Sequence, residues 1–145
     1  MHNPKRPHHQ RVLRLLNSLS AELLETSACY FGGGTRIVLE LGEYRESLDV
    51  DFLCANQDGY RELRNQVNNQ SLGGIFAHQP TLLREVRADM YSIRTFVEID
   101  AQPVKFEIIR EDASGWQVHT YPTCRLLVWI TQAPLPGMYC QINRL

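Results

Sequence analysis

Two aspartates, Asp49 and Asp51, have the side chains and the spacing of a metal site. They alternate with Leu48, Val50 and Phe52, a period-two pattern typical of a half-buried strand. Alternate strand side chains leave the same face, so we expect the carboxylates to point together, about 7 Å apart, while the apolar residues anchor in the core. Two like charges at that distance favour a bound cation, and oxygen ligands favour Mg²⁺ or Mn²⁺ over zinc. The alternative is two solvent-facing strand residues without a ligand.

A glycine-rich segment with Gly32, Gly33 and Gly34 precedes the aspartates. Thr35 is expected to cap the start of a short helix that ends at Gly42. The backbone N–H groups of a glycine turn and the positive end of a helix dipole both bind anions, so this segment predicts a phosphate site. The order of glycine turn, short helix and acidic strand brings that site close to the aspartates.

A third carboxylate comes from a later segment, residues 104–109. Its alternation of apolar and charged residues predicts a strand with Lys105 and Glu107 on one face. If this strand lies beside the first one, a third acid and a cation join the two aspartates. Glu98 and Asp100, on one face of the preceding strand, are competing third acids.

The other segments of the sequence predict the helices and strands that position these residues. Leucine periodicity over residues 9–29 predicts one amphipathic helix, and residues 58–70 predict a polar one. Residues 93–100 and 104–109 predict a hairpin, with a neighbouring strand over 82–88. We therefore expect an α/β (α+β) fold, in which a small mixed, mostly antiparallel sheet is flanked by helices that come first and last in the chain.

The 145 residues are expected to form one domain, 1–145, with a motif-bearing core at about residues 30–110. Hydrophobic residues make up 43% and charged residues 21%, which excludes a disordered or fibrous chain. The tail over residues 120–145 is atypical. It carries three prolines, and only residues 126–130 predict a strand or short helix.

Charge and hydropathy restrict the partners. The net charge of −1 predicts no global attraction to nucleic acid or anionic membranes, so any such binding must be local. No apolar run approaches the roughly 20 residues of a bilayer span, so we expect a cytoplasmic protein with no membrane partner. The four cysteines lack zinc-ligand spacing and are expected to be reduced thiols. His2, His8 and His9 are expected in a frayed N-terminal arm, as solvated or packed side chains.

Two segments, Phe31–Thr35 and Arg45–Phe52, together resemble the signature of the nucleotidyltransferase AbiEii/AbiGii toxin family. This family is a branch of the DNA polymerase β-like nucleotidyltransferases. Their shared order is Gly-Gly or Gly-Ser, a short helix, apolar-Asp-apolar-Asp-apolar, and later a third acid on a strand. Val104–Ile109 resembles that last element. The resemblance covers about residues 30–110 and implies a polymerase β-like nucleotidyltransferase core.

The resemblance also implies the residues of an active site. Asp49 and Asp51 would bind two Mg²⁺ ions, with Mn²⁺ as a substitute, and Glu107 would hold one ion and draw the proton from the attacking hydroxyl. Arg45 and Ser47 match the family's Arg-x-Ser, and we expect Arg45 to make a supporting salt bridge. The residues predicted to bind the nucleotide are Gly33, Gly34, Thr35, Arg45, Ser47 and Lys105, the last by its position alone.

The implied function is transfer of a nucleotide from an NTP to an acceptor hydroxyl. In the family the acceptor can be RNA, including tRNA ends, and a separate antitoxin is the partner in a bacterial toxin–antitoxin setting. The family pattern favours Glu107 over Glu98 as the third acid. Members usually continue into a helical C-terminal half that nothing after Arg110 resembles, so we expect a truncated chain. Two alternatives stay open: a non-catalytic truncated domain that binds nucleotide or a partner protein, and a binding or assembly domain whose acids are surface residues.

Overall fold

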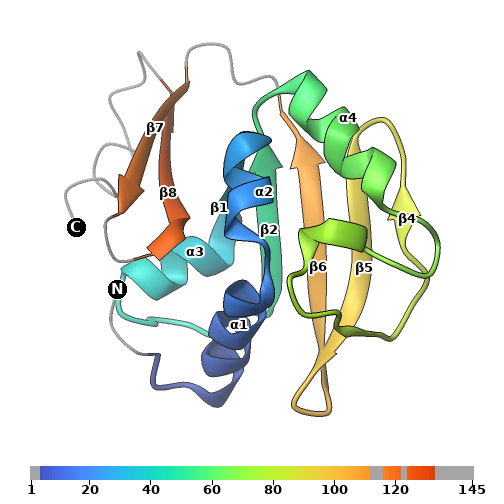
Figure 1. Ribbon diagram of the computed structural model, residues 1–145. Coiled ribbons are helices and arrows are strands. Elements are labelled where there is room, and N and C mark those ends of the chain that lie inside the picture. The colour runs from blue at the N-terminus through green and yellow to red at the C-terminus, as the bar shows by residue number, and fades with distance from the viewer. Residues whose placement is uncertain (1–3, 112–115, 122–123, 133–145) are drawn as a thin grey trace.

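The computed structural model describes residues 4–111, 116–121 and 124–132, with side chains over 4–111. Its central element is a six-stranded sheet made of β1 (Cys29–Gly32), β2 (Asp49–Cys54), β3 (Thr81–Leu82), β4 (Arg87–Ala88), β5 (Ser92–Ile99) and β6 (Gln102–Arg110). The strand order is β1-β2-β6-β5-β3, and β4 also pairs with β5 (Figure 1). β2 and β6 run parallel, whereas the other pairs in this sheet are antiparallel, which confirms the expected mixed, mostly antiparallel α/β architecture.

Helices and a short 3₁₀ turn cover one face of this sheet, where the hydrophobic core lies (Figure 1). These elements are α1 (Pro7–Ser18), α2 (Ala21–Thr26), α4 (Gln57–Gln66) and η1 (Gly73–Ile75), and α3 (Gly33–Glu40) directly follows β1. Phe31, Phe52 and Phe106 are fully buried in the core. The ring centroid of Phe52 lies 5.6 Å from that of Phe31 and 5.9 Å from that of Phe106. Because strand side chains alternate, the residues next to these rings point to the opposite face of the sheet.

The predicted single helix over residues 9–29 is wrong, because the chain is extended at Leu19 and Ser20. The backbone N–H of Ser20 donates to the carbonyl of Ile75 at 2.8 Å, and its hydroxyl accepts from the N–H of Leu23 to cap α2. The leucine spacing continues through the break because α1 and α2 pack on the same core. Periodicity alone therefore did not reveal it.

The other predicted elements are present with shifted boundaries. The hairpin is β5–β6, and its turn is made by Asp100 and Ala101, with φ of 52° and 61°, the conformation of a tight hairpin turn. The polar helix ends at Gln66, four residues earlier than predicted, since Val67 is already extended. The strand predicted over residues 82–88 is two short strands, β3 and β4.

The last elements that the structure describes are strands, where the sequence pattern predicts a closing helix. β7 (Trp116–Tyr121) and β8 (Cys124–Gln132) form an antiparallel pair, and β8 lies against β1 (Figure 1). The strand alternative for residues 126–130 is therefore confirmed, whereas residues 133–145 of the atypical tail lie outside the described residues. Among the described helices, none has both the length and the apolar character needed to cross a membrane. Cys29 and Cys54 are buried free thiols, as expected.

Candidate active site

The two acidic strands lie side by side. In the parallel pairing of β2 with β6, Asp51 is opposite Glu107 and Asp49 is opposite Lys105. The predicted adjacency of these strands is therefore confirmed, and all four charged side chains leave the face that the core does not occupy. The prediction that Leu48 anchors in the core is wrong. Leu48 is 52% exposed because β2 begins at Asp49, the residue after it.

The three carboxylates outnumber the one lysine beside them. Burial raises the pKa of Asp51, and Asp49 and Glu107 raise it further, whereas Lys105 lowers it. The Nζ of Lys105 lies 3.1 Å from the Oε2 of Glu107, and this contact raises the pKa of Lys105. Such an oxygen-rich, repulsive donor set fits Mg²⁺ or Mn²⁺. Within residues 4–111, no three acidic, histidine or cysteine side chains are already arranged to hold a metal. To serve as a metal ligand, Glu107 would therefore have to give up its contact with Lys105.

The glycine turn directly abuts the acids. Gly33 has a φ of +74°, and a Cβ at this position would lie 2.8 Å from the Oδ2 of Asp51. A Cβ on Gly34 would lie 3.1 Å from the Nη2 of Arg45. Only glycine therefore lets the N-terminus of α3 approach Asp51 this closely. The helix starts at Gly33 with Gly32 as its N-cap, so the prediction that Thr35 caps it is wrong.

We expect Gly33→Ala to lower the free energy of unfolding by about 1–3 kcal/mol, because an alanine is strained at positive φ. The new methyl group would also displace Asp51, so the Mg²⁺–NTP binding proposed below should weaken about tenfold or more. Gly42→Ala is the matched control, since Gly42 has a φ of +79° and nothing lies within 4 Å of its Cβ position. Urea denaturation and calorimetry would measure both variants. Equal NTP binding by the two variants would contradict the close approach of glycine to Asp51.

Thr35 and Ser47 join the glycine turn to the segment before β2. Their hydroxyl oxygens lie 2.7 Å apart, and both residues are buried. Each hydroxyl therefore has the other as its partner, and the pair ties the first turn of α3 to the acidic strand. That these two residues contact a nucleotide stays a prediction.

Arg45 lies on the surface beside Gly34. Its Nη1 donates to the carbonyl of Glu46 at 3.2 Å, and its guanidinium lies 5.9 Å from the centre of the Tyr44 ring. Within residues 4–111, no ion pair includes Arg45, so the supporting salt bridge predicted for it is not found in this part of the chain. The guanidinium is instead available to an anion at the glycine turn.

The competing third acids lie elsewhere. On β5, the residue opposite Glu107 is Arg94, whereas Glu98 is opposite Pro103 near the hairpin turn. Asp100 forms the turn itself and pairs with Arg14. The register therefore brings Glu107, and neither alternative, next to Asp51.

The sequence model described as "Nucleotidyl transferase AbiEii toxin, Type IV TA system" matches residues 14–141. This chain belongs to the AbiEii family. Its match includes the glycine turn, both aspartates and Glu107, and it covers β7 and β8 as well. No curated protein is significantly similar to this AbiEii chain.

Three solved structures are similar to this AbiEii chain. The first is a candidate nucleotidyltransferase from H. pylori, with 20% identity and a TM-score of 0.45, covering 80% of this chain and 50% of that one. JHP933 from Helicobacter pylori has 20% identity and a TM-score of 0.42 over 76% and 47% of the two chains. A candidate nucleotidyltransferase from Thermotoga maritima has 15% identity and a TM-score of 0.42 over 96% and 87%. The chain spans about half the length of the two Helicobacter proteins.

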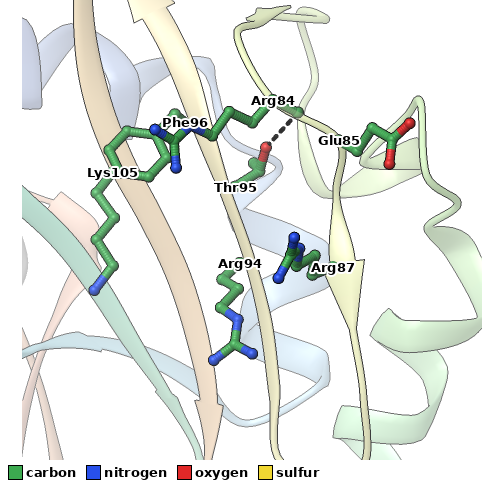
Figure 2. Close-up of a pocket in the computed structure, with 7 residues that line it drawn as sticks. All are labelled: Arg84, Glu85, Arg87, Arg94, Thr95, Phe96 and Lys105. Atoms are coloured by element: carbon green, nitrogen blue, oxygen red, sulfur yellow. Dashed lines mark hydrogen bonds between the residues drawn. The ribbon is translucent and has the colours of Figure 1, made fainter.

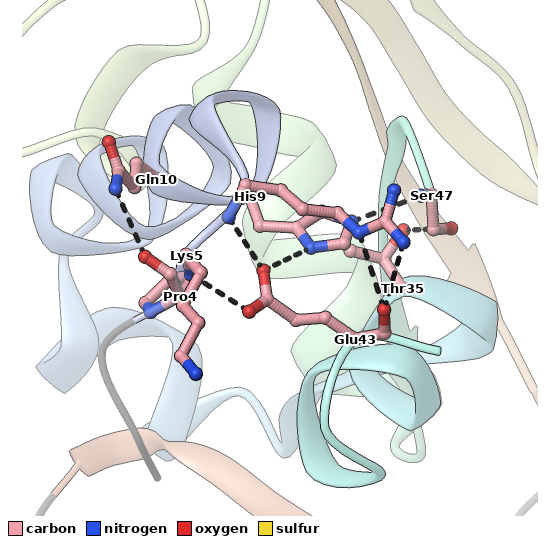
Figure 3. A network of polar contacts seen from close by, with 8 residues as sticks. Pro4, Lys5, His9, Gln10, Thr35, Glu43 and Ser47 are labelled. Atoms are coloured by element: carbon pink, nitrogen blue, oxygen red, sulfur yellow. Dashed lines mark hydrogen bonds and ion pairs between the residues drawn. The ribbon is translucent and has the colours of Figure 1, made fainter. Parts of the chain in front are cut away.

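A buried network behind the AbiEii motif was missed from the sequence (Figure 3). His9 is fully buried; its Nδ1 lies 2.7 Å from the Oε1 of Glu43, and its Nε2 accepts a hydrogen bond from the N–H of Ser47 at 3.1 Å. Because Nε2 accepts from Ser47, the hydrogen bond to Glu43 uses a proton on Nδ1. The prediction that His9 lies in a frayed arm is therefore wrong. Its position on the apolar stripe of α1 was the feature of the sequence that pointed to its burial. The network fixes the segment that leads into Asp49.

Glu43 gives this network a pH dependence. Hydrogen bonds from the backbone N–H groups of Lys5 and Arg6, and from His9, lower the pKa of Glu43 from its ordinary 4.5 to about 2. A carboxyl with a lowered folded pKa adds stability above its unfolded pKa, and this stability is lost as the pH falls from 4.5 to about 2. We therefore expect Glu43→Gln to unfold at lower urea than the wild type at about pH 6, and the difference to vanish near about pH 2. Glu46→Gln, at an exposed position of the same loop, should follow the wild type. A pH-independent effect of Glu43→Gln would contradict this account.

Proposed function

We propose that this chain transfers a nucleotide from a nucleoside triphosphate to an acceptor hydroxyl, using Mg²⁺ or Mn²⁺. The observation that carries the proposal is the parallel register of β2 and β6, which sets Asp51 beside Glu107. The approach of Gly33 to Asp51 supports it further, because an anion at the N-terminus of α3 would lie next to the acids.

The proposed roles follow from these positions. Bound divalent ions supply charge that stabilises the attacking and leaving oxygens of an in-line displacement. Asp49 and Asp51 would hold these ions, and Glu107, once released from its lysine, would also accept the proton of the acceptor hydroxyl. The remaining groups bind and orient the triphosphate: the backbone N–H groups of Gly33 and Gly34, the guanidinium of Arg45 and the ammonium of Lys105.

The biological setting proposed for this activity follows from the family. The description of the family as a toxin of a type IV toxin–antitoxin system supports a bacterial, cytoplasmic enzyme with a cognate antitoxin protein as its partner. We propose RNA, including tRNA ends, as the acceptor class.

A second candidate function is a non-catalytic domain that binds nucleotide or a partner protein. The observation that favours it is the 3.1 Å contact between Lys105 and Glu107, which engages the proposed third acid. In that case the aspartates and the glycine turn would bind Mg²⁺–NTP, but no proton acceptor would be available for transfer.

Two measurements on the full chain separate these functions. Calorimetry with each NTP, with and without Mg²⁺, measures binding, and incubation of labelled NTPs with total RNA measures transfer. Metal-dependent binding together with labelled RNA supports the transferase. Metal-dependent NTP binding without labelling of RNA supports the second candidate. The absence of both signals contradicts the transferase and any nucleotide binding, and leaves only a domain that binds a partner protein.

A further inference from the structure

A cluster of arginines lies on the same face of the sheet as the acids, two strands away from Asp51. Arg84, Arg87 and Arg94, named here the arginine pocket, line a cavity of about 410 Å³ together with Phe96 and Lys105 (Figure 2). One acid, Glu85, also lines this cavity. Figure 2 shows its carboxylate pointing away from the arginines, so cationic side chains predominate around the cavity.

The strand register places this pocket in line with the catalytic groups. Across the sheet, Gly32 on β1 is opposite Asp51 on β2, which is opposite Glu107 on β6. Glu107 is in turn opposite Arg94 on β5, and Arg94 is opposite Arg87 on β4. Neighbouring strands are about 4.8 Å apart, so one row runs from the glycine turn through the acids to the arginines.

The described residues neutralise the charge of these arginines only in part. Arg87 and Arg94 are directly opposite on antiparallel strands, an arrangement that is unfavourable for like charges. Within residues 4–111, ion pairing of the arginine pocket is limited to a 3.8 Å contact between the Nη2 of Arg94 and the Oδ2 of Asp89, two half-exposed side chains. A bound polyanion would account for this repulsive pair.

The pocket also offers an aromatic surface. The guanidinium carbon of Arg84 lies 4.8 Å from the centre of the Phe96 ring, and Phe96 is half-buried on the face that carries Lys105. Arginine planes and aromatic rings are the surfaces on which unpaired bases stack, and arginine forks bind phosphate with two parallel hydrogen bonds. The combination matches a single nucleic-acid strand better than an isolated phosphate.

We infer that the arginine pocket binds the phosphates of a nucleic-acid acceptor strand and directs its terminal hydroxyl to Asp51 and Glu107. The inference rests on the proposed nucleotidyl transfer. In-line displacement puts the attacking and leaving oxygens on opposite sides of the phosphorus. The leaving pyrophosphate belongs at the glycine turn, on the β1 side, so the acceptor must approach from β5, where the arginines are. The net charge of −1 makes this a local attraction and not a property of the whole surface.

The test compares binding of a fluorescent single-stranded RNA oligonucleotide with a free 3′ hydroxyl, followed by anisotropy, with calorimetric binding of Mg²⁺–NTP. The pocket variant is Arg87→Gln/Arg94→Gln, and its matched control is Arg61→Gln/Arg64→Gln on α4, which removes the same charge from the helical face. We expect the pocket variant to bind RNA about tenfold or more weakly, and to lose about 0.7 from the slope of log affinity against log salt for each lost phosphate contact. The control should stay within about twofold of the wild type.

Three outcomes would overturn the inference. Equal weakening by the pocket and control variants would mean general electrostatics. Loss of NTP binding with RNA binding retained would assign the arginines to the triphosphate. A wild-type chain that binds Mg²⁺–NTP but no RNA would point to a different acceptor, such as a protein, and would leave the proposed transfer intact. Removing one of two opposed arginines should not harm folding, so Arg87→Gln alone provides a second variant if the double variant fails to fold.

Discussion

Replacing Asp49 and Asp51 together by asparagine is expected to lower nucleotide transfer by on the order of 10³-fold and to abolish the Mg²⁺ dependence of NTP binding. Asparagine keeps the size of the side chain but removes the charge that attracts a hard cation. Because burial and neighbouring carboxylates already raise the pKa of Asp51, the double variant should fold at least as stably as the wild type. Labelled-NTP transfer, calorimetry and urea denaturation would measure the three effects on the same samples.

A second pair of variants tests the third acid, Glu107, against the competing acid Glu98. Glu107→Gln should reduce transfer about as strongly as one aspartate variant, while Glu98→Gln, on the neighbouring strand and near the hairpin turn, should leave it unchanged. Full activity of the aspartate double variant would instead support a domain whose acids are surface residues. A larger effect from Glu98 than from Glu107 would mean that the register of β2 with β6 does not define the site.

Phe52→Ala is expected to reduce the free energy of unfolding by about 3–5 kcal/mol. Phe52 has no exposed surface, and its ring packs between Phe31 of β1 and Phe106 of β6, on the core side of the strand that carries Asp51. A loss of this size is a large share of the stability of an ordinary domain. The lost contacts would loosen the three strands that align the glycine turn with the acids.

Leu48→Ala tests whether the residue before β2 contributes to the core. Leu48 is 52% exposed and precedes β2, so its replacement should change stability by less than about 0.5 kcal/mol. The urea midpoints of both variants would be compared with that of the wild type. Similar losses from Leu48→Ala and Phe52→Ala would mean that the strand begins earlier and that Leu48 is part of the core, as the alternation alone predicts.

Much of the candidate site was predictable from local pattern. Asp49 and Asp51 share a face because strand geometry repeats every two residues, and the same rule placed Lys105 beside Glu107. The glycine turn and short helix were recognised from residue types whose backbone preferences act over a few positions. These features depend on neighbours in the chain, so the sequence was enough to identify them and the family resemblance that they carry.

The break at Leu19 shows where local pattern fails. Helical spacing of leucines predicted one helix, but a hydrogen bond from Ser20 to Ile75, far along the chain, accompanies an extended link between two helices. His9 shows the same limit, since its partners Glu43 and Ser47 are more than thirty positions away. Neither pairing leaves a periodic trace in the sequence.

Local sequence pattern was sufficient to locate the chemically important groups: two carboxylates on one strand face, a third acid with a lysine on another, and a glycine turn before them. Which strands are neighbours came from the folded structure, and with it the pairing of Asp51 with Glu107 and the continuation of the same row by Arg94 and Arg87. Side-chain alternation could be predicted because it is a property of each strand alone. Register between strands is selected by the packing of the whole core, to which distant segments contribute together.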